Sequence, residues 1–197
     1  MLLPLALSAE WVQHTEETQA RGRGAGSCRF CGHAAAGWQE RFGVKDGRAG
    51  KSKDGTAAAC AFCHLVRHIE RPEIDREAVL IWSPELTQAA LNRIAWRIFE
   101  ILAAHGLAPD AEAGAAAGEA PARAASLRDE LRALSAAAER EAGTCAPSEL
   151  AEVFLGLRRG REAWSAPPLG GLRLWPLGRL FIDGRDVLPS LLGIQKD

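Results

Sequence analysis

Hydrophobic residues recur along the middle of the chain with the spacing of an amphipathic helix. Apolar side chains occupy every fourth position over 86–102, and neighbouring apolar positions widen this stripe. Ser83 is a typical N-cap residue, and Pro84 suits the first position of a helix. Gly106 has the residue type that commonly follows a helix. The pattern therefore predicts a helix that begins at Pro84 and ends before Gly106.

Shorter patterns predict further elements on both sides of this helix. The apolar run at 78–82 predicts a buried strand, and residues 172–182 contain two short strand patterns. Segments 126–142 and 148–159 each begin at a serine of capping type and each stop at a glycine. We therefore expect two more helices over these segments.

The composition is that of a globular protein, with 47% hydrophobic and 25% charged residues in 197. Lys and Arg number 24 and Asp and Glu 25, which argues against a general nucleic-acid-binding protein, because such proteins usually carry a basic surface. No apolar stretch approaches the roughly 18–20 residues that span a bilayer. The apolar opening at 1–7 lacks a basic start and is interrupted by Pro4, so we expect a strand there rather than an export signal.

Four of the five cysteines form two CxxC pairs, which are the strongest chemical signal in the chain. The pairs are Cys28 with Cys31 and Cys60 with Cys63. Two such turns complete a tetrahedral Zn²⁺ site with Zn–S distances of about 2.3 Å. Because four protein ligands leave no open coordination position, we expect a structural site. Cys145 stands alone and is expected to be a bystander.

The segment between the pairs is longer than the roughly 15–20 residues of a compact zinc ribbon, which leaves room for a β-hairpin. The residues after Cys63 look like the start of a helix. Two cysteine turns, a hairpin and a helix make up the zinc-stabilised ββα fold of HNH-type nucleases. We therefore expect an α+β protein with a zinc-stapled HNH-like ββα core, then an amphipathic helix, an Ala-rich linker and a mostly helical C-terminal region.

Composition also divides the chain into three parts. Residues 1–105 hold the cysteine pairs and the first strand and helix patterns. Residues 106–125 consist almost wholly of Ala, Gly, Pro and Glu, which is typical of a linker. We predict a zinc-binding domain over 1–105, a flexible linker over 106–125, and a helical region with a Pro-rich tail over 126–197.

Several segments of the first 105 residues match a known family pattern. They are Cys-Arg-Phe-Cys-Gly at 28–32, Trp-Gln-Glu at 38–40, Cys-Ala-Phe-Cys-His at 60–64 with His68 one turn later, Leu-Pro-Leu-Ala-Leu-Ser at 3–8, and Ile-Trp-Ser-Pro-Glu-Leu-Thr-Gln-Ala-Ala-Leu-Asn at 81–92. In these segments the chain resembles the HNH-like zinc fold and, more narrowly, the IcmJ/DotN family of type IVB secretion systems. The segment at 82–88 is the most specific part, because many zinc proteins share the cysteine pattern.

This resemblance implies a role in secretion. Members of the family are cytoplasmic parts of the type IV coupling complex that dock onto the extended C-terminal tail of its membrane-anchored ATPase. They help to display adaptors that recruit effector substrates. On this basis we expect a non-catalytic, zinc-binding scaffold in the cytoplasm, recruited to the inner membrane by its partner. The expected partners are the ATPase tail and other coupling-complex subunits, without nucleic acid and without direct insertion into the membrane.

The residues that an HNH nuclease needs are missing from their expected positions. Such a site uses a general base, usually His, and two or three metal ligands. The family pattern places an acid or His and the base directly after Glu40, where this chain has Arg-Phe-Gly at 41–43. His64 matches a helix-borne ligand, which we interpret as a vestige of a second metal site, and His68 is expected on the helix surface. We therefore predict that the protein is not an enzyme.

The long helix also offers a candidate contact for a partner. Trp96 lies about 100° around the helix from the line of Ile94 and Ile98. Tryptophan is enriched among residues that dominate binding, so we consider Trp96 a partner-binding residue. The same position also suits packing beneath residues 1–20.

Two other functions stay open at this level. One is an active HNH-type, metal-dependent nuclease whose base comes from an unexpected position such as His33, which metal-dependent nicking of DNA would indicate. The other is a zinc-ribbon module that binds nucleic acid, which salt-dependent binding to DNA or RNA would indicate.

Overall fold

The computed structural model describes Leu7 and residues 20–23, 26–35, 38–43, 56–114, 117–158 and 169–194. The helices are α1 (Ala61–Arg67), α2 (Ile74–Glu77), α3 (Gln88–Ala104), α4 (Glu119–Ala133), α5 (Ser135–Ala142), α6 (Pro147–Arg158) and α7 (Leu188–Leu191). The strands are β1 (Ala20–Arg23), β2 (Gly26–Ser27), β3 (Ala34–Ala35), β4 (Trp38–Gly43), β5 (Thr56–Cys60), β6 (Ala78–Trp82), β7 (Leu172–Pro176), β8 (Phe181–Ile182) and β9 (Arg185–Asp186). The protein is therefore a mixed α+β fold with small antiparallel sheets, as predicted at that level.

The cysteine region contains a small antiparallel sheet and the helix that follows it. β4 pairs with β1 on one side and with β5 on the other. β5 continues directly into α1, because Cys60 ends the strand and also stands at the N-cap of the helix. β4, β5 and α1 thus follow one another along the chain between and after the two cysteine pairs. Most of the loop expected over 43–56 lies outside the described residues, as does the strand expected at 1–7 except for Leu7.

The predicted strand at 78–82 is confirmed as β6, and it pairs with β7 from near the end of the chain. The two strands run antiparallel, with Leu80 opposite Leu174. β7 and β8 correspond to the two strand patterns predicted within 172–182. Gln88 satisfies the outer edge of β7, since its side chain accepts a hydrogen bond from Leu174 N and donates one to Leu174 O, both at 2.8 Å.

The long helix begins later than the sequence predicts. Its N-cap is Thr87 rather than Ser83, and the Thr87 hydroxyl accepts a hydrogen bond from Ala90 N at 3.2 Å. Ser83 instead donates its backbone N–H to Gly171 O. This bond continues the pairing of β6 and β7 beyond the last residue of β6. The predicted end of the helix is confirmed by Gly106, which has a positive φ of 72°.

The other two predicted helices begin earlier than expected, and the single helix predicted over 126–142 is instead two helices, α4 and α5, which meet at Leu134. α4 begins at Glu119, inside the predicted linker, because the alanines that resemble a linker are also the best helix formers. Arg128 ties α4 to the segment before it by donating to Pro109 O and Ala111 O, both at 2.8 Å. α6 begins at Pro147, so Ser148 lies inside the helix and bonds the Asp75 carboxylate.

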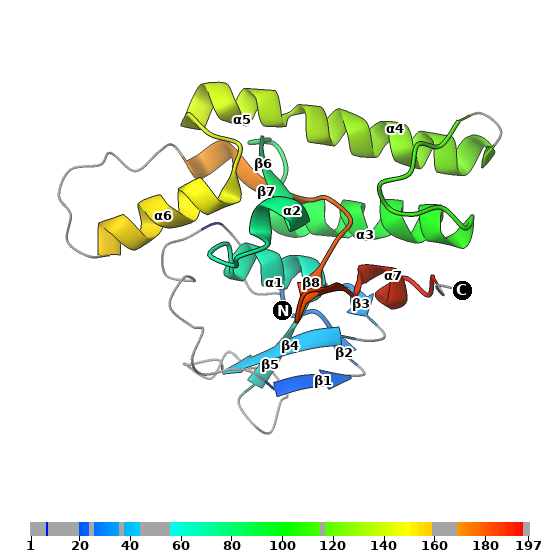
Figure 1. The fold of residues 1–197 in the computed structure, drawn as a ribbon, viewed down its shortest axis with the longest axis horizontal. Coiled ribbons are helices and arrows are strands. Elements are labelled where there is room, and N and C mark those ends of the chain that lie inside the picture. The colour runs from blue at the N-terminus through cyan, green and yellow to red at the C-terminus, as the bar shows by residue number, and fades with distance from the viewer. Residues whose placement is uncertain are drawn as a thin grey trace.

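Figure 1 shows the described elements as successive layers, from the β1–β4–β5 sheet through α1 to α3 and then to α4 and α5. A continuous cluster of buried hydrophobic residues includes side chains from α1, α3, β6, α4, α6 and β7. Residues on both sides of the predicted linker therefore share one sheet and one core. None of the helices in the described ranges combines the length and the apolar character needed to cross a membrane.

Candidate metal centre

The four paired cysteines come together in the interior of the protein. They are Cys28, Cys31, Cys60 and Cys63, all buried, and their sulfur atoms lie within 4.8 Å of one another. The Sγ atoms of Cys31 and Cys60 are 3.6 Å apart, which is far longer than the roughly 2.05 Å of a disulfide. Sulfurs at the corners of a tetrahedron with metal–sulfur bonds of about 2.3 Å lie about 3.8 Å apart. The predicted cluster is thus a possible four-sulfur metal site.

Two different turns deliver the cysteines to this cluster. The first pair lies in the turn between β2 and β3, where Cys28 N donates to His33 O at 2.8 Å and Gly32 N donates to Cys28 O at 2.9 Å. Gly32 closes this turn with a φ of 76°, which glycine adopts without steric cost. The second pair spans the end of β5 and the first turn of α1. Burial raises the pKa of Cys60 and Cys63, so these thiols must release their protons to bind a metal.

Helix α3 donates hydrogen bonds to the cysteine sulfurs. Trp96 Nε1 donates to Cys60 Sγ and Asn92 Nδ2 donates to Cys63 Sγ, each at 3.3 Å. Such donors stabilise the negative charge of thiolates and orient them toward a metal. The pattern that could have revealed Asn92 and Trp96 is their separation by four residues, which places both on one face of α3.

Trp96, considered above as a partner-binding residue, is buried. Its side chain is only 4% exposed. The indole is stacked against His33 on one side and Phe62 on the other, with ring centroids 4.3 Å and 4.2 Å away. Trp96 faces the cysteine cluster because that side offers both an apolar stack and a sulfur that accepts its N–H.

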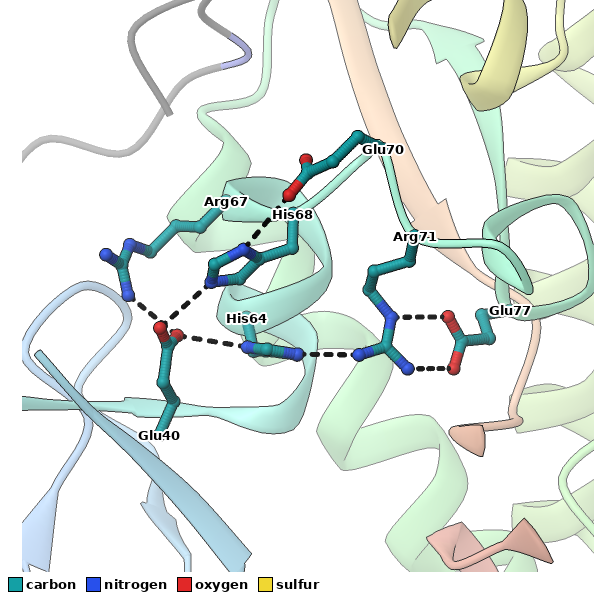
Figure 2. Close-up of polar contacts among 7 residues, drawn as sticks. All are labelled: Glu40, His64, Arg67, His68, Glu70, Arg71 and Glu77. Carbon is teal, nitrogen blue, oxygen red and sulfur yellow. Dashed lines mark hydrogen bonds and ion pairs between the residues drawn. The ribbon is translucent and has the colours of Figure 1, made fainter. Parts of the chain in front are cut away.

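A second cluster of metal-ligand residue types also includes residues of α1. It consists of Glu40 from β4 and of His64 and His68 from α1 (Figure 2). The Glu40 carboxylate is 3.0 Å from His64 Nδ1 through Oε2 and 2.9 Å from His68 Nε2 through Oε1. His68 is buried, so its expected place on the helix surface is wrong. His64 is therefore not a lone remnant, because Glu40 and His68 share its cluster.

Two arginines also take part in this cluster. Arg67 donates to Glu40 Oε2 at 2.6 Å, and Arg71 donates to His64 Nε2 at 2.9 Å. Since Arg71 cannot accept a hydrogen bond, His64 must accept at Nε2 and carry its proton on Nδ1. Arg71 also forms two hydrogen bonds to the buried Glu77 carboxylate, at 2.9 Å and 2.7 Å. Figure 2 shows these side chains as one continuous polar network.

The pKa values of the two histidines in this network are shifted in opposite directions. Burial lowers the pKa of His64 to about 4, with further lowering by His68 and Arg71, although Glu40 acts in the opposite direction. Burial alone would also lower the pKa of His68, but its hydrogen bonds to Glu40 and Glu70 outweigh burial and raise it. Burial opposes ionisation of Glu40, yet its hydrogen bonds from His64 and His68 hold its pKa well below the usual range.

The chain matches no family model and no curated protein. Inferences about function therefore depend on the two clusters and on the resemblance seen in the sequence.

The positions directly after Glu40 in the sequence hold Arg41 and Phe42. Arg41 is exposed, whereas Phe42 is buried, with its ring 5.3 Å from the ring of Phe30 and 3.9 Å from the guanidinium carbon of Arg67. His33, the alternative base, stacks on Trp96 and does not belong to the Glu40 cluster. The positions directly after Glu40 thus hold a cationic and a hydrophobic side chain, and the imidazoles that contact Glu40 come from α1 instead.

Proposed function

We propose that this protein is a non-catalytic scaffold that binds one structural Zn²⁺ through Cys28, Cys31, Cys60 and Cys63. It acts as an adaptor subunit of a type IV secretion coupling complex and docks the C-terminal tail of the coupling ATPase, which helps to recruit effector substrates. The observation that carries the scaffold role is the closed cluster of four buried sulfurs.

Zinc is the metal that this donor set favours. Thiolate ligands select soft or borderline metals, and four sulfurs in tetrahedral arrangement are typical of structural zinc. All four ligands come from the protein, so no coordination position is left for water or substrate. The order of β4, β5 and α1 around these ligands supports the zinc-stapled, HNH-like ββα core expected from the cysteine spacing.

The absence of nuclease chemistry is supported by the residues around Glu40. Metal-assisted cleavage of a phosphodiester needs a general base and a metal with open coordination positions. Phe42 takes the place of a base, and Arg67 and Arg71 already contact the Glu40 and His64 atoms that would bind an ion. A protein with such a site retains the fold and lacks the means to activate water.

The adaptor role rests on the resemblance to the IcmJ/DotN family. In this role the protein is cytoplasmic and reaches the inner-membrane face through its partner. A folded domain without catalytic groups is suited to hold an extended segment of another chain. Because Trp96 is buried against the metal cluster, the tail must dock elsewhere than on its indole.

The adaptor role is tested by calorimetry between the zinc-loaded protein and the C-terminal tail of a coupling ATPase from the same organism. We expect saturable binding at micromolar concentrations or below, and no binding of a scrambled tail of the same composition. An absence of binding to the native tail at tens of micromolar would eliminate the adaptor role.

A nuclease is the second candidate, because Glu40, His64 and His68 include residue types that bind metals. Plasmid DNA incubated with the protein and Mg²⁺, Mn²⁺, Ni²⁺ or Zn²⁺ distinguishes the two functions. Cleavage that His64→Ala abolishes would establish the nuclease and contradict the scaffold.

A further inference from the structure

We infer that Arg67 and Arg71 take the place of a divalent cation at the cluster of Glu40, His64 and His68, so that the chain's own guanidinium groups close this cluster to metal. This exclusion deepens the non-catalytic part of the proposed function, on which it rests, and is independent of the partner's identity.

The donor set alone would be suitable for a metal ion. One carboxylate and two imidazoles are a common set of ligands for Zn²⁺ and other transition metals. One ligand atom from each of Glu40, His64 and His68 lies within 4.8 Å of the other two. α1 presents both histidines from successive turns, and β4 presents the carboxylate opposite them.

The observed contacts use the same atoms that a metal would need. Glu40 Oε2 accepts from both His64 Nδ1 and Arg67, while Glu40 Oε1 contacts His68 Nε2. His64 Nε2 accepts from Arg71, and its Nδ1 carries a proton. A metal at either nitrogen of His64 must therefore displace Arg71 or remove the proton that bonds Glu40.

Both arginines are held firmly in these positions. Arg71 donates to both oxygens of Glu77, whose side chain is fully buried, and also to Phe181 O at 2.6 Å. The side chain of Arg67 is 2% exposed and lies over the ring of Phe42. Moving either guanidinium away would leave a buried carboxylate without its cation, which is strongly unfavourable.

Electrostatic repulsion also opposes the binding of a metal ion at this cluster. A divalent ion at this cluster would lie beside two guanidinium groups in a poorly solvated environment, where like charges repel much more strongly than in water. Glu40 and Glu77 are already balanced by Arg67 and Arg71. The cluster therefore has its full complement of positive charge without an added ion.

The test compares Co²⁺ binding by the zinc-loaded wild type and by the double variant Arg71→Ala/Glu77→Gln. Glu77→Gln removes the carboxylate that would otherwise be left unpaired, and it keeps an oxygen for the N–H of Phe181. We expect no second-site Co²⁺ binding by the wild type. The double variant should gain one Co²⁺ per chain with affinity at least about 100-fold higher, because Arg71 no longer occupies Nε2 of His64 or repels the ion.

Two controls locate the added ion. His64→Ala in the double-variant background should remove the second Co²⁺. Arg123→Ala should behave as the wild type, because Arg123 is an exposed arginine of α4 that pairs with Glu119 on the same helix. Tail binding should persist in the double variant, which separates this test from that of the adaptor role.

Either of two results would overturn the exclusion of metal. One is a second Co²⁺ bound by the wild type and lost in His64→Ala. The other is a folded double variant, verified by circular dichroism, that still binds no second ion. The wild-type measurement decides the question even if the double variant does not fold.

Discussion

The guanidinium of Arg71 donates a hydrogen bond to Nε2 of His64 at 2.9 Å. This contact links the cluster around Glu40 to the buried Glu77, which in turn accepts a hydrogen bond from Phe181 N. Helix α1 is thereby joined to the C-terminal hairpin of β8 and β9. His64, whose residue type suggests a metal ligand in the sequence, is thus hydrogen-bonded to an arginine in the fold.

The pKa values of the two histidines of α1 should be shifted in opposite directions from the ordinary value. We expect His64 to protonate near pH 4 and His68 to protonate above its ordinary pKa of about 6.5. Two-dimensional NMR of the imidazole carbons and nitrogens in the zinc-loaded protein measures both values. Arg71→Ala/Glu77→Gln should raise the pKa of His64, and equal values near 6.5 for both histidines in the wild type would contradict the network.

These shifts also determine how stability depends on pH. Between about pH 6.5 and 4 the unfolded chain protonates His64 while the folded chain does not, so this residue makes stability fall as pH falls. The contribution of His68 has the opposite sign: it is present below about pH 6.5 and is lost as pH rises through the raised pKa of the folded state. Urea unfolding of wild type and His64→Gln across this range should show a flatter pH dependence in the variant.

Cys60→Ser should remove the metal and unfold the cysteine region. Structural zinc contributes on the order of 10–16 kcal/mol in small sites, which exceeds the stability of a typical domain. Cys145→Ser is the matched control, because Cys145 is a partly buried thiol outside the cluster. Metal content and circular dichroism measure the outcome. A soluble, normally folded Cys60→Ser protein without metal would show that the site does not support the fold.

Trp96→Phe should lower the affinity for the metal while it preserves most of the aromatic packing. Phenylalanine keeps an aromatic ring between His33 and Phe62 but loses the N–H that bonds Cys60 Sγ. Loss of an outer-shell hydrogen bond typically lowers metal affinity by about 10–100-fold. Competition with a chromophoric chelator gives the affinity, and unchanged affinity in Trp96→Phe would show that the indole N–H does not act on the metal site.

Gly171→Ala should destabilise the packing against Trp82 at the end of the β6–β7 sheet where Trp82 pairs with Leu172. A Cβ at Gly171 would lie 2.5 Å from ring atoms of Trp82, so the indole would have to move. Overpacking of this kind costs about 1–3 kcal/mol. Gly170→Ala is the matched control, because its Cβ would meet no atom within 4 Å. Equal urea midpoints for the two variants would contradict this packing.

The sequence predicted the features that depend on local pattern. The two CxxC pairs predicted the sulfur cluster, and the apolar run at 78–82 predicted β6, because spacing and hydrophobicity within a few residues determine these elements. The start of α3 depends on distant residues and was misplaced. Gln88 bonds β7, and Ser83 bonds Gly171, so the N-terminus of the helix is determined by a strand near the end of the chain.

The cluster around Glu40 could not be derived from spacing alone. His64 and His68 are one turn apart in the sequence, but their shared partner lies on β4, and the register of β4 against α1 is a tertiary feature. Burial of Trp96 was equally a tertiary outcome, since helical periodicity identifies its face and not what covers it. Both outcomes concern polar groups whose partners are far away in the sequence.

We propose that the metal of this protein stabilises the fold and performs no chemistry. X-ray absorption at the zinc edge of the purified protein tests that claim most directly, because the ligand set distinguishes a closed structural site from an open catalytic one. We predict one zinc per chain with four sulfur neighbours at about 2.3 Å and no nitrogen or oxygen neighbours. Zinc bound by nitrogen and oxygen atoms, as Glu40, His64 and His68 would provide, would contradict the account.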